Sequence, residues 1–131
     1  MPARPLSPHL SIYRMYRYTL LTSFLNRLTG VALSLALVLL VYWLTAVAGG
    51  ARSQARAAWL LNLPVMKLVY AACIFAFCYH LVAGIRHLVW DTGHGLERSQ
   101  SRSSSWLVLV ASVLLMLIIG TFAFVFAGRA P

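Results

Sequence analysis

The chain has 131 residues, of which 61% are hydrophobic and only 10% are charged. Soluble domains carry about 25% charged residues, so this composition excludes an ordinary water-soluble fold and indicates an integral membrane protein. Eleven basic residues face two acidic ones, but the basic residues are scattered beside apolar segments, which makes nucleic-acid binding a poor explanation of the charge.

The N-terminal segment reads "RPLSPHLSIYRMYRY" and is unlike the rest of the chain. Its prolines and its lack of a regular apolar period argue against a long helix. Its tyrosines and arginines suit a membrane interface and contact with a soluble partner. We therefore expect residues 1–22 to form an arm on the inner side of the membrane, next to a soluble subunit.

Three apolar segments follow, at about residues 28–47, 64–90 and 106–127. A helix needs about 20 residues to cross the hydrocarbon core of a bilayer, and each segment supplies that length. The sequence predicts an all-α membrane protein over residues 23–128, with three spanning helices arranged up-down-up.

The basic residues predict the orientation. Seven lie in the N-terminal part or near the loop between the second and third spans: Arg4, Arg14, Arg17, Arg27, Arg86, Arg98 and Arg102. Four lie on the other side: Arg52, Arg56, Lys67 and Arg129. Because basic residues are enriched on the cytoplasmic side, this distribution places the N-terminus inside.

The segment "SFLNRLTG" leads into the first span. Ser23 and Arg27 are four residues apart and share a helix face, which Gly30 and Ser34 continue. Such a pair can donate hydrogen bonds to a quinone carbonyl or to haem propionates. The same two residues could instead be a helix N-cap and a positively charged anchor at the inner interface.

A stripe of three polar residues and a glycine runs along the second span, where polar side chains are energetically costly to bury. His80, Gly84, His87 and Asp91 follow spacings of 4, 3 and 4, which place them on one helix face. His80 lies roughly 15 Å from the inner end, where water cannot satisfy an imidazole. Gly84 would leave room beside it for a flat ligand such as haem. An interhelical hydrogen bond beside a close-packing glycine is the alternative, and the spacing leaves both open.

The histidine count adds one consequence. The other two histidines, His9 and His94, lie outside the spans. If His80 ligates a six-coordinate haem, the second axial ligand must come from another subunit. His87 could contact a propionate, relay protons or lie in water, and Arg86 points away from the stripe, where it could extend to the inner interface.

Three sequence blocks together resemble the large cytochrome b subunit of the membrane anchor of succinate dehydrogenase. They are "RPLSPHLSIYR", "SFLNRLTG" and "HLVAGIRHLVWDTG". The resemblance implies that His80 is one axial ligand of haem b and that a second anchor subunit supplies the other. It also implies that Ser23, Arg27 and Asp91 belong to a quinone site beside the iron–sulfur subunit, and that Arg27 and His87 lie near the haem propionates.

One position departs from the family pattern. The residue before the arginine is often histidine there, and here it is Asn26. An asparagine can donate a hydrogen bond to a propionate, but it does not titrate near neutral pH. The resemblance thus implies a contact near haem for Asn26, with its role in proton transfer in doubt.

The resulting prediction is a membrane-anchor subunit of succinate:quinone oxidoreductase that carries half of a haem site and no complete active site. Its partners would be the second anchor, iron–sulfur and flavoprotein subunits, membrane lipid, and ubiquinone or menaquinone. The N-terminus lacks an Arg- and Ser-rich presequence, which favours a bacterial inner membrane. The alternatives are a fumarate reductase anchor, a small transporter subunit with a proton path, or a purely structural membrane protein.

Overall fold

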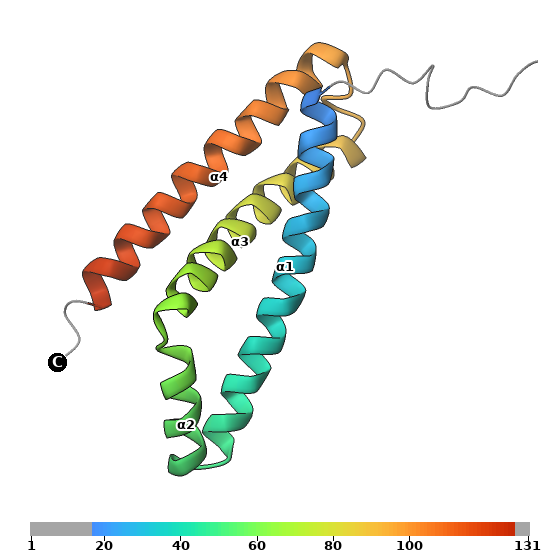
Figure 1. The fold of residues 1–131 in the computed structure, drawn as a ribbon. Helices are drawn as coiled ribbons and strands as arrows, with labels where there is room; N and C mark the ends of the chain where they lie inside the picture. The colour runs from blue at the N-terminus through green and yellow to red at the C-terminus, as the bar shows by residue number, and fades with distance from the viewer. Residues whose placement is uncertain (1–16, 128–131) are drawn as a thin grey trace, which may run out of the picture.

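The computed structural model describes residues 17–127, which form four helices and no strand (Figure 1). They are α1 (Arg17–Ala48), α2 (Ala51–Leu61), α3 (Pro64–Asp91) and α4 (Arg98–Ala127). Helices α1, α3 and α4 are long and apolar enough to cross a membrane. The prediction of an all-α protein with three spanning helices is confirmed. Successive spans run in opposite directions.

Helix α1 includes part of the segment expected to form the N-terminal arm. Helix α1 begins at Arg17, six residues before the expected start of the membrane domain at residue 23. The last proline before α1 is Pro8, so no proline opposes a helix that includes Arg17. The expected arm therefore overlaps the first turns of α1, and the rest of it, residues 1–16, lies outside the described part of the chain.

Helix α2 is a short element that the sequence reasoning did not anticipate. Gly50 takes a positive φ of 86° and reverses the chain between α1 and α2. Ala57 of α2 is fully buried, while Trp59 is exposed. Pro64 then starts α3 at a position where its missing N–H costs nothing. The pattern of α2, with arginines one turn apart and an exposed tryptophan, is typical of a helix at a membrane interface.

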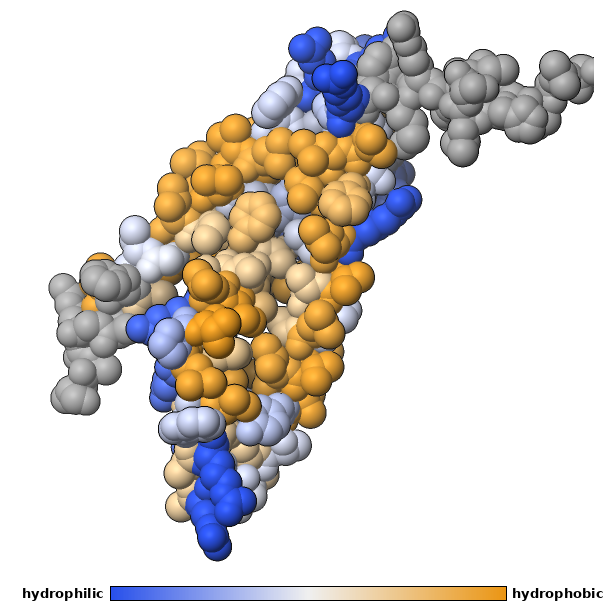
Figure 2. Space-filling model, in the orientation of Figure 1, coloured by the Kyte–Doolittle hydropathy of each residue, from blue (hydrophilic) through white to orange (hydrophobic). Residues whose placement is uncertain are grey.

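Helix α3 packs against both α1 and α4 and forms the centre of the bundle. Its Tyr79 and Ala83 and the α4 residue Val108 are the buried core. Most other large apolar side chains are exposed, and Figure 2 shows them as a broad hydrophobic band with hydrophilic residues towards both ends. Such a band suits contact with lipid and with other membrane subunits.

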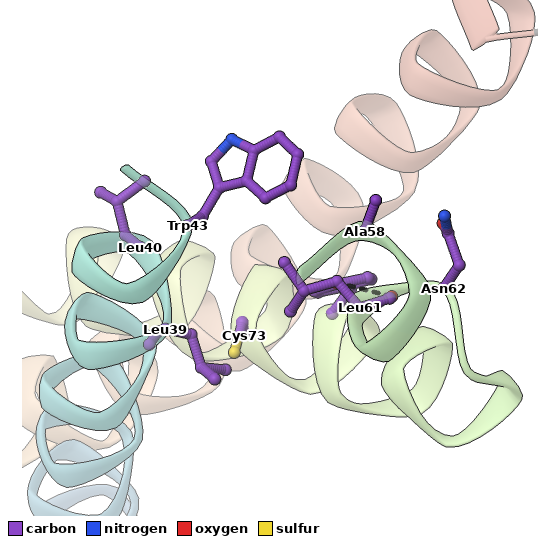
Figure 3. Close-up of a pocket in the computed structure, with 9 residues that line it drawn as sticks. Leu39, Leu40, Trp43, Ala58, Leu61, Asn62 and Cys73 are labelled. Atoms are coloured by element: carbon purple, nitrogen blue, oxygen red, sulfur yellow. Dashed lines mark hydrogen bonds between the residues drawn. The ribbon is translucent and has the colours of Figure 1, made fainter. Parts of the chain in front are cut away.

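A cavity of about 460 Å³ lies where α2 meets α1 and α3 (Figure 3). Its lining is mainly aliphatic, with an indole, a phenol, an amide and a thiol: Ala36, Leu39, Leu40, Trp43, Ala58, Leu61, Asn62, Tyr70 and Cys73. None of these residues belongs to the polar stripe described below. This apolar cavity is thus separate from the candidate site.

Candidate functional site

The polar stripe of the second span lies on one unbroken helix. Helix α3 continues to Asp91 and ends where Gly93 adopts a φ of 81°. The N–H of Gly93 donates to the carbonyl of Trp90, which closes the last turn in the usual glycine-terminated manner. His80, Gly84, His87 and Asp91 therefore share a face, as the spacing predicted.

His80 is half-buried and contacts α1 at two adjacent residues. Its Nδ1 lies 3.3 Å from the hydroxyl oxygen of Thr29. A β-carbon added to Gly30 would lie 3.4 Å from its Cε1 atom, an ordinary van der Waals contact, so α1 lies close to this side of the ring. The other ring nitrogen, Nε2, has no hydrogen-bond partner within residues 17–127. Sequence reasoning missed Thr29, although it directly precedes the glycine of "LTG".

Gly84 borders open space rather than the ring of His80. A β-carbon built there would meet no heavy atom within 4 Å. The sequence-based expectation that Gly84 leaves room is consistent with this geometry, while the glycine in contact with the imidazole is Gly30. The two glycines therefore differ in their surroundings: Gly30 lies against the ring of His80, and Gly84 borders open space on the surface of α3.

Asn26 and His87 form a second contact between α1 and α3, with 3.4 Å between Asn26 Nδ2 and His87 Nε2. The Oδ1 atom of Asn26 is buried and has no partner among the described residues. An amide can donate from Nδ2 to an unprotonated imidazole or, turned over, accept from a protonated one. Asn26 can thus accompany either charge state of His87 without titrating itself.

The predicted quinone residues lie at the same end of the bundle but do not contact one another. Arg27 and Asp91 are exposed and Ser23 is half-buried. No hydrogen bond or ion pair joins any of the three to another side chain within residues 17–127. Ser23 lies well inside α1, so the alternative that it is a helix N-cap is wrong. The described residues contain no cluster of three or more metal-ligating side chains.

Arg86 lies against α4, which corrects the expectation that it extends to the inner interface. Its Nε donates to the Ser104 hydroxyl at 2.9 Å, and its Nη2 donates to the Ser105 hydroxyl at 2.9 Å. Nη2 also donates to the carbonyl of Ser101 at 2.9 Å. We call Arg86 and these three serines the arginine–serine clamp. The serine-rich start of α4, "RSQSRSSSW", was the overlooked signal for it.

Trp90 joins this clamp to the polar stripe. The guanidinium of Arg86 lies 4.0 Å from the centroid of the Trp90 ring, a cation–π distance. The centroids of the His87 and Trp90 rings are 5.2 Å apart. The indole N–H donates to the carbonyl of Gly95 at 3.0 Å and so holds the loop before α4. His87 is therefore bounded by Asn26 on one helix and by Trp90 on its own.

Comparisons with known proteins give matches over most of the chain. Residues 1–119 match the family described as "Succinate dehydrogenase/Fumarate reductase transmembrane subunit". The chain is 38% identical to the succinate dehydrogenase cytochrome b556 subunit of Paracoccus denitrificans over 123 residues, 94% of each chain. It is 38% identical to the Rickettsia felis protein of the same name over 88% of this chain and 90% of that one.

A mitochondrial relative shows the same level of similarity. The chain is 38% identical to the succinate dehydrogenase cytochrome b560 subunit of Sus scrofa, over 85% of this chain and 66% of that protein. The family match covers the first two spans, with every residue of the candidate site, and most of the third. The chain belongs to the family of succinate dehydrogenase and fumarate reductase transmembrane subunits.

Proposed function

We propose that this chain is the cytochrome b anchor subunit of a succinate:quinone oxidoreductase. It would hold haem b jointly with a second anchor subunit and form part of the site at which quinone is reduced. The observation that carries the proposal is the state of His80: inside a spanning helix, with Nδ1 held by Thr29 and Nε2 without a partner in the described chain. A polar nitrogen at that depth costs several kcal/mol unless it is satisfied, and iron ligation would satisfy it.

The surroundings of His80 fit a haem. The open space beside Gly84 would accept the macrocycle, and the polar groups of Asn26, Arg27 and His87 lie on the same two helices. With its amide turned over, Asn26 would accept from a protonated His87 and donate to a propionate, which would leave neither polar atom unsatisfied. Haem, when bound, supplies a one-electron carrier within the membrane.

At the quinone site, Arg27 and Ser23 would act as hydrogen-bond donors. A guanidinium aimed at a quinone oxygen stabilises the negative charge that develops there during reduction. Neither side chain has a hydrogen-bond partner within residues 17–127, which supports a role as donors to such a substrate. Protons would reach the oxygen from the inner aqueous side, where Asp91 is exposed and His87 lies one turn deeper.

The remaining components would come from other chains. Electrons would arrive from the iron–sulfur subunit, which receives them from the flavoprotein, because residues 17–127 hold no cluster of metal-ligating residues. Residues 1–22 would contact the iron–sulfur subunit. With the bias in basic residues, the proposed location is a bacterial inner membrane with the N-terminus in the cytoplasm.

A fumarate reductase anchor is the second candidate, because the family description names both enzymes. The same hydrogen-bond donors would then hold a quinol during oxidation. A transporter subunit is less well supported. That function would favour an interrupted helix or several intramembrane carboxylates, whereas α3 is continuous and Asp91, at its end, is the one acidic residue on the described spanning helices.

The proposal is tested by a reduced-minus-oxidised absorption spectrum of the complex purified through this chain. We expect a b-type haem signal that is lost in an assembled complex with His80→Ala. His94→Ala is the control, since His94 lies in the loop after α3 and contacts Thr92. A complex without haem, or an assembled His80→Ala complex that keeps the signal, would overturn the assignment.

A further inference from the structure

Thr29 and Gly30 hold one side of the His80 ring between them. Thr29 is 4% exposed and supplies the oxygen atom 3.3 Å from Nδ1. Gly30 supplies a surface without a side chain, against which Cε1 lies. Two adjacent residues of α1 thus fix the position of one imidazole edge, and Nε2 remains available at the opposite end of the same ring.

The hydrogen bonds of Thr29 determine which nitrogen of His80 carries the proton. A hydroxyl has one proton to donate, and that of Thr29 is 2.8 Å from the Leu25 carbonyl and 3.1 Å from the Asn26 carbonyl. Both carbonyls are closer to the hydroxyl oxygen than Nδ1 is, at 3.3 Å, so the proton is directed to a carbonyl and the oxygen accepts from His80. The Nδ1 atom must then carry the hydrogen, which leaves the Nε2 lone pair free to bind a metal.

We propose that Thr29 and Gly30 are positioning residues that select the metal-binding tautomer of His80 and hold its Nε2 in place. This inference rests on the proposed function, in which His80 ligates haem iron. A hydrogen bond donated by Nδ1–H increases the electron density of the ring and makes it a stronger donor to the metal. Thr29 therefore stabilises the ferric state and lowers the reduction potential of the haem.

The chain contains a matched control for Thr29. Thr22 lies on the same helix, is 6% exposed, and donates its hydroxyl to the Tyr18 and Thr19 carbonyls at 3.0 and 3.3 Å. It repeats the buried position and the backbone hydrogen bonds of Thr29, but no histidine within residues 17–127 forms a hydrogen bond with its oxygen. Substituting the two threonines separates the loss of a helix hydrogen bond from the loss of the imidazole contact.

The first test is potentiometric titration of the haem in the purified complex. Thr29→Val should shift the midpoint potential to a more positive value. Thr22→Val should leave the potential unchanged, and so should Thr29→Ser, which keeps the hydroxyl. If Thr29→Val prevents haem incorporation while Thr22→Val permits it, the positioning role is supported directly. Equal potentials in the Thr29→Val, Thr22→Val and unmodified complexes would overturn the inference.

The second test concerns Gly30 and uses the electron paramagnetic resonance spectrum of the ferric haem, which reports the orientation of the axial imidazoles. Gly30→Ala adds a β-carbon at ordinary contact distance and should change the spectrum little. Gly30→Val adds atoms beyond that contact and should displace the ring, so the spectrum shifts or haem is lost. An unchanged Gly30→Val spectrum would overturn the role of Gly30. A complex with no haem even when unmodified would instead overturn the proposed function.

Discussion

The two interfaces of α3 differ in how their polar groups are hydrogen-bonded. Arg86, at the α3–α4 interface, has its partners within this chain, whereas His80 and Asn26, at the α1–α3 interface, each have a polar atom without a partner among the described residues. On the α4 side, Arg86 has four hydrogen bonds and a tryptophan ring, all from this chain. On the α1 side, the next residue, His87, has a single long contact with Asn26, whose Oδ1 is buried and unpaired. His80 likewise uses one ring nitrogen and leaves the other free.

We interpret this difference as one between a structural interface and the proposed functional one. In a membrane, a polar group must find a partner within the protein or in a ligand, because lipid offers none. The α3–α4 interface satisfies its charged residue internally and has no need of anything else. The α1–α3 interface does not, so its open atoms are where a cofactor, a substrate or another subunit would bind.

Replacing Arg27 should have the largest effect on the proposed quinone site. We expect Arg27→Ala to reduce quinone reductase activity by about 10²-fold, the usual effect of removing one donor to a developing negative charge. Succinate oxidation with an artificial acceptor should continue, because that reaction does not need the quinone site. Arg102→Ala is the control, as an exposed arginine in the first turns of α4. Equal activities of the Arg27→Ala and Arg102→Ala complexes would remove Arg27 from the site.

Gly84 tests whether the open surface of α3 is the space that haem needs. Gly84→Leu should lower the haem-to-protein ratio several-fold, since a leucine would fill space that is empty of protein atoms. Gly120→Leu is the control: its β-carbon also meets no atom within 4 Å, but it lies on α4. The ratio is measured by absorption of the reduced complex against protein concentration. Full haem content in the Gly84→Leu complex would place the macrocycle elsewhere.

Sequence reasoning predicted the polar stripe of the second span but not the contrast between the two interfaces, because intramembrane polar residues are rare enough to be informative singly. Apolar length alone gave the three spans, and a spacing of 4, 3 and 4 put the stripe on one helix. The proposed roles of His80, Arg27 and their neighbours stay predictions. What the sequence could not supply was the identity of the contacts across helices, since periodicity shows which face a residue occupies and not what lies opposite.

Thr29 and Arg86 illustrate that limit in different ways. Thr29 resembles any small residue of a membrane helix, and only the approach of α1 to α3 gives it a histidine to contact. Arg86 was expected at the interface because a long basic side chain near a helix end can reach water. The serines of α4 provided nearer acceptors, and sequence reasoning did not pair two segments fifteen or more residues apart.

The loss of stability on substituting the arginine–serine clamp should depend on whether the charge of Arg86 remains. Replacing Ser104 and Ser105 together by alanine leaves a partly buried charge with fewer acceptors and should cost about 1–3 kcal/mol. Adding Arg86→Leu to that variant should recover part of the loss, because removing the charge removes its need for partners. Thermal unfolding of the purified complex measures both effects, and the haem spectrum should stay unchanged. If Arg86→Leu deepens the loss instead, the clamp stabilises mainly through its bonds.

Tyr79 is a polar residue of the α1–α3 interface whose hydroxyl does have a partner within the chain. It is fully buried, and its hydroxyl donates to the Thr22 carbonyl at 3.0 Å, so it leaves nothing open. Tyr79→Phe should lower the stability of the complex by roughly 0.6 kcal/mol, the average for a hydrogen bond between membrane helices. Haem content and potential should not change, because the phenol hydroxyl bonds the Thr22 carbonyl and is not part of the hydrogen bond between Thr29 and His80. Tyr70→Phe, whose hydroxyl bonds the Leu61 carbonyl at the α2 end, is the matched control. A shift in haem potential with Tyr79→Phe alone would mean that the Tyr79 hydrogen bond influences the haem. The structural and functional contacts of the α1–α3 interface would then be energetically coupled.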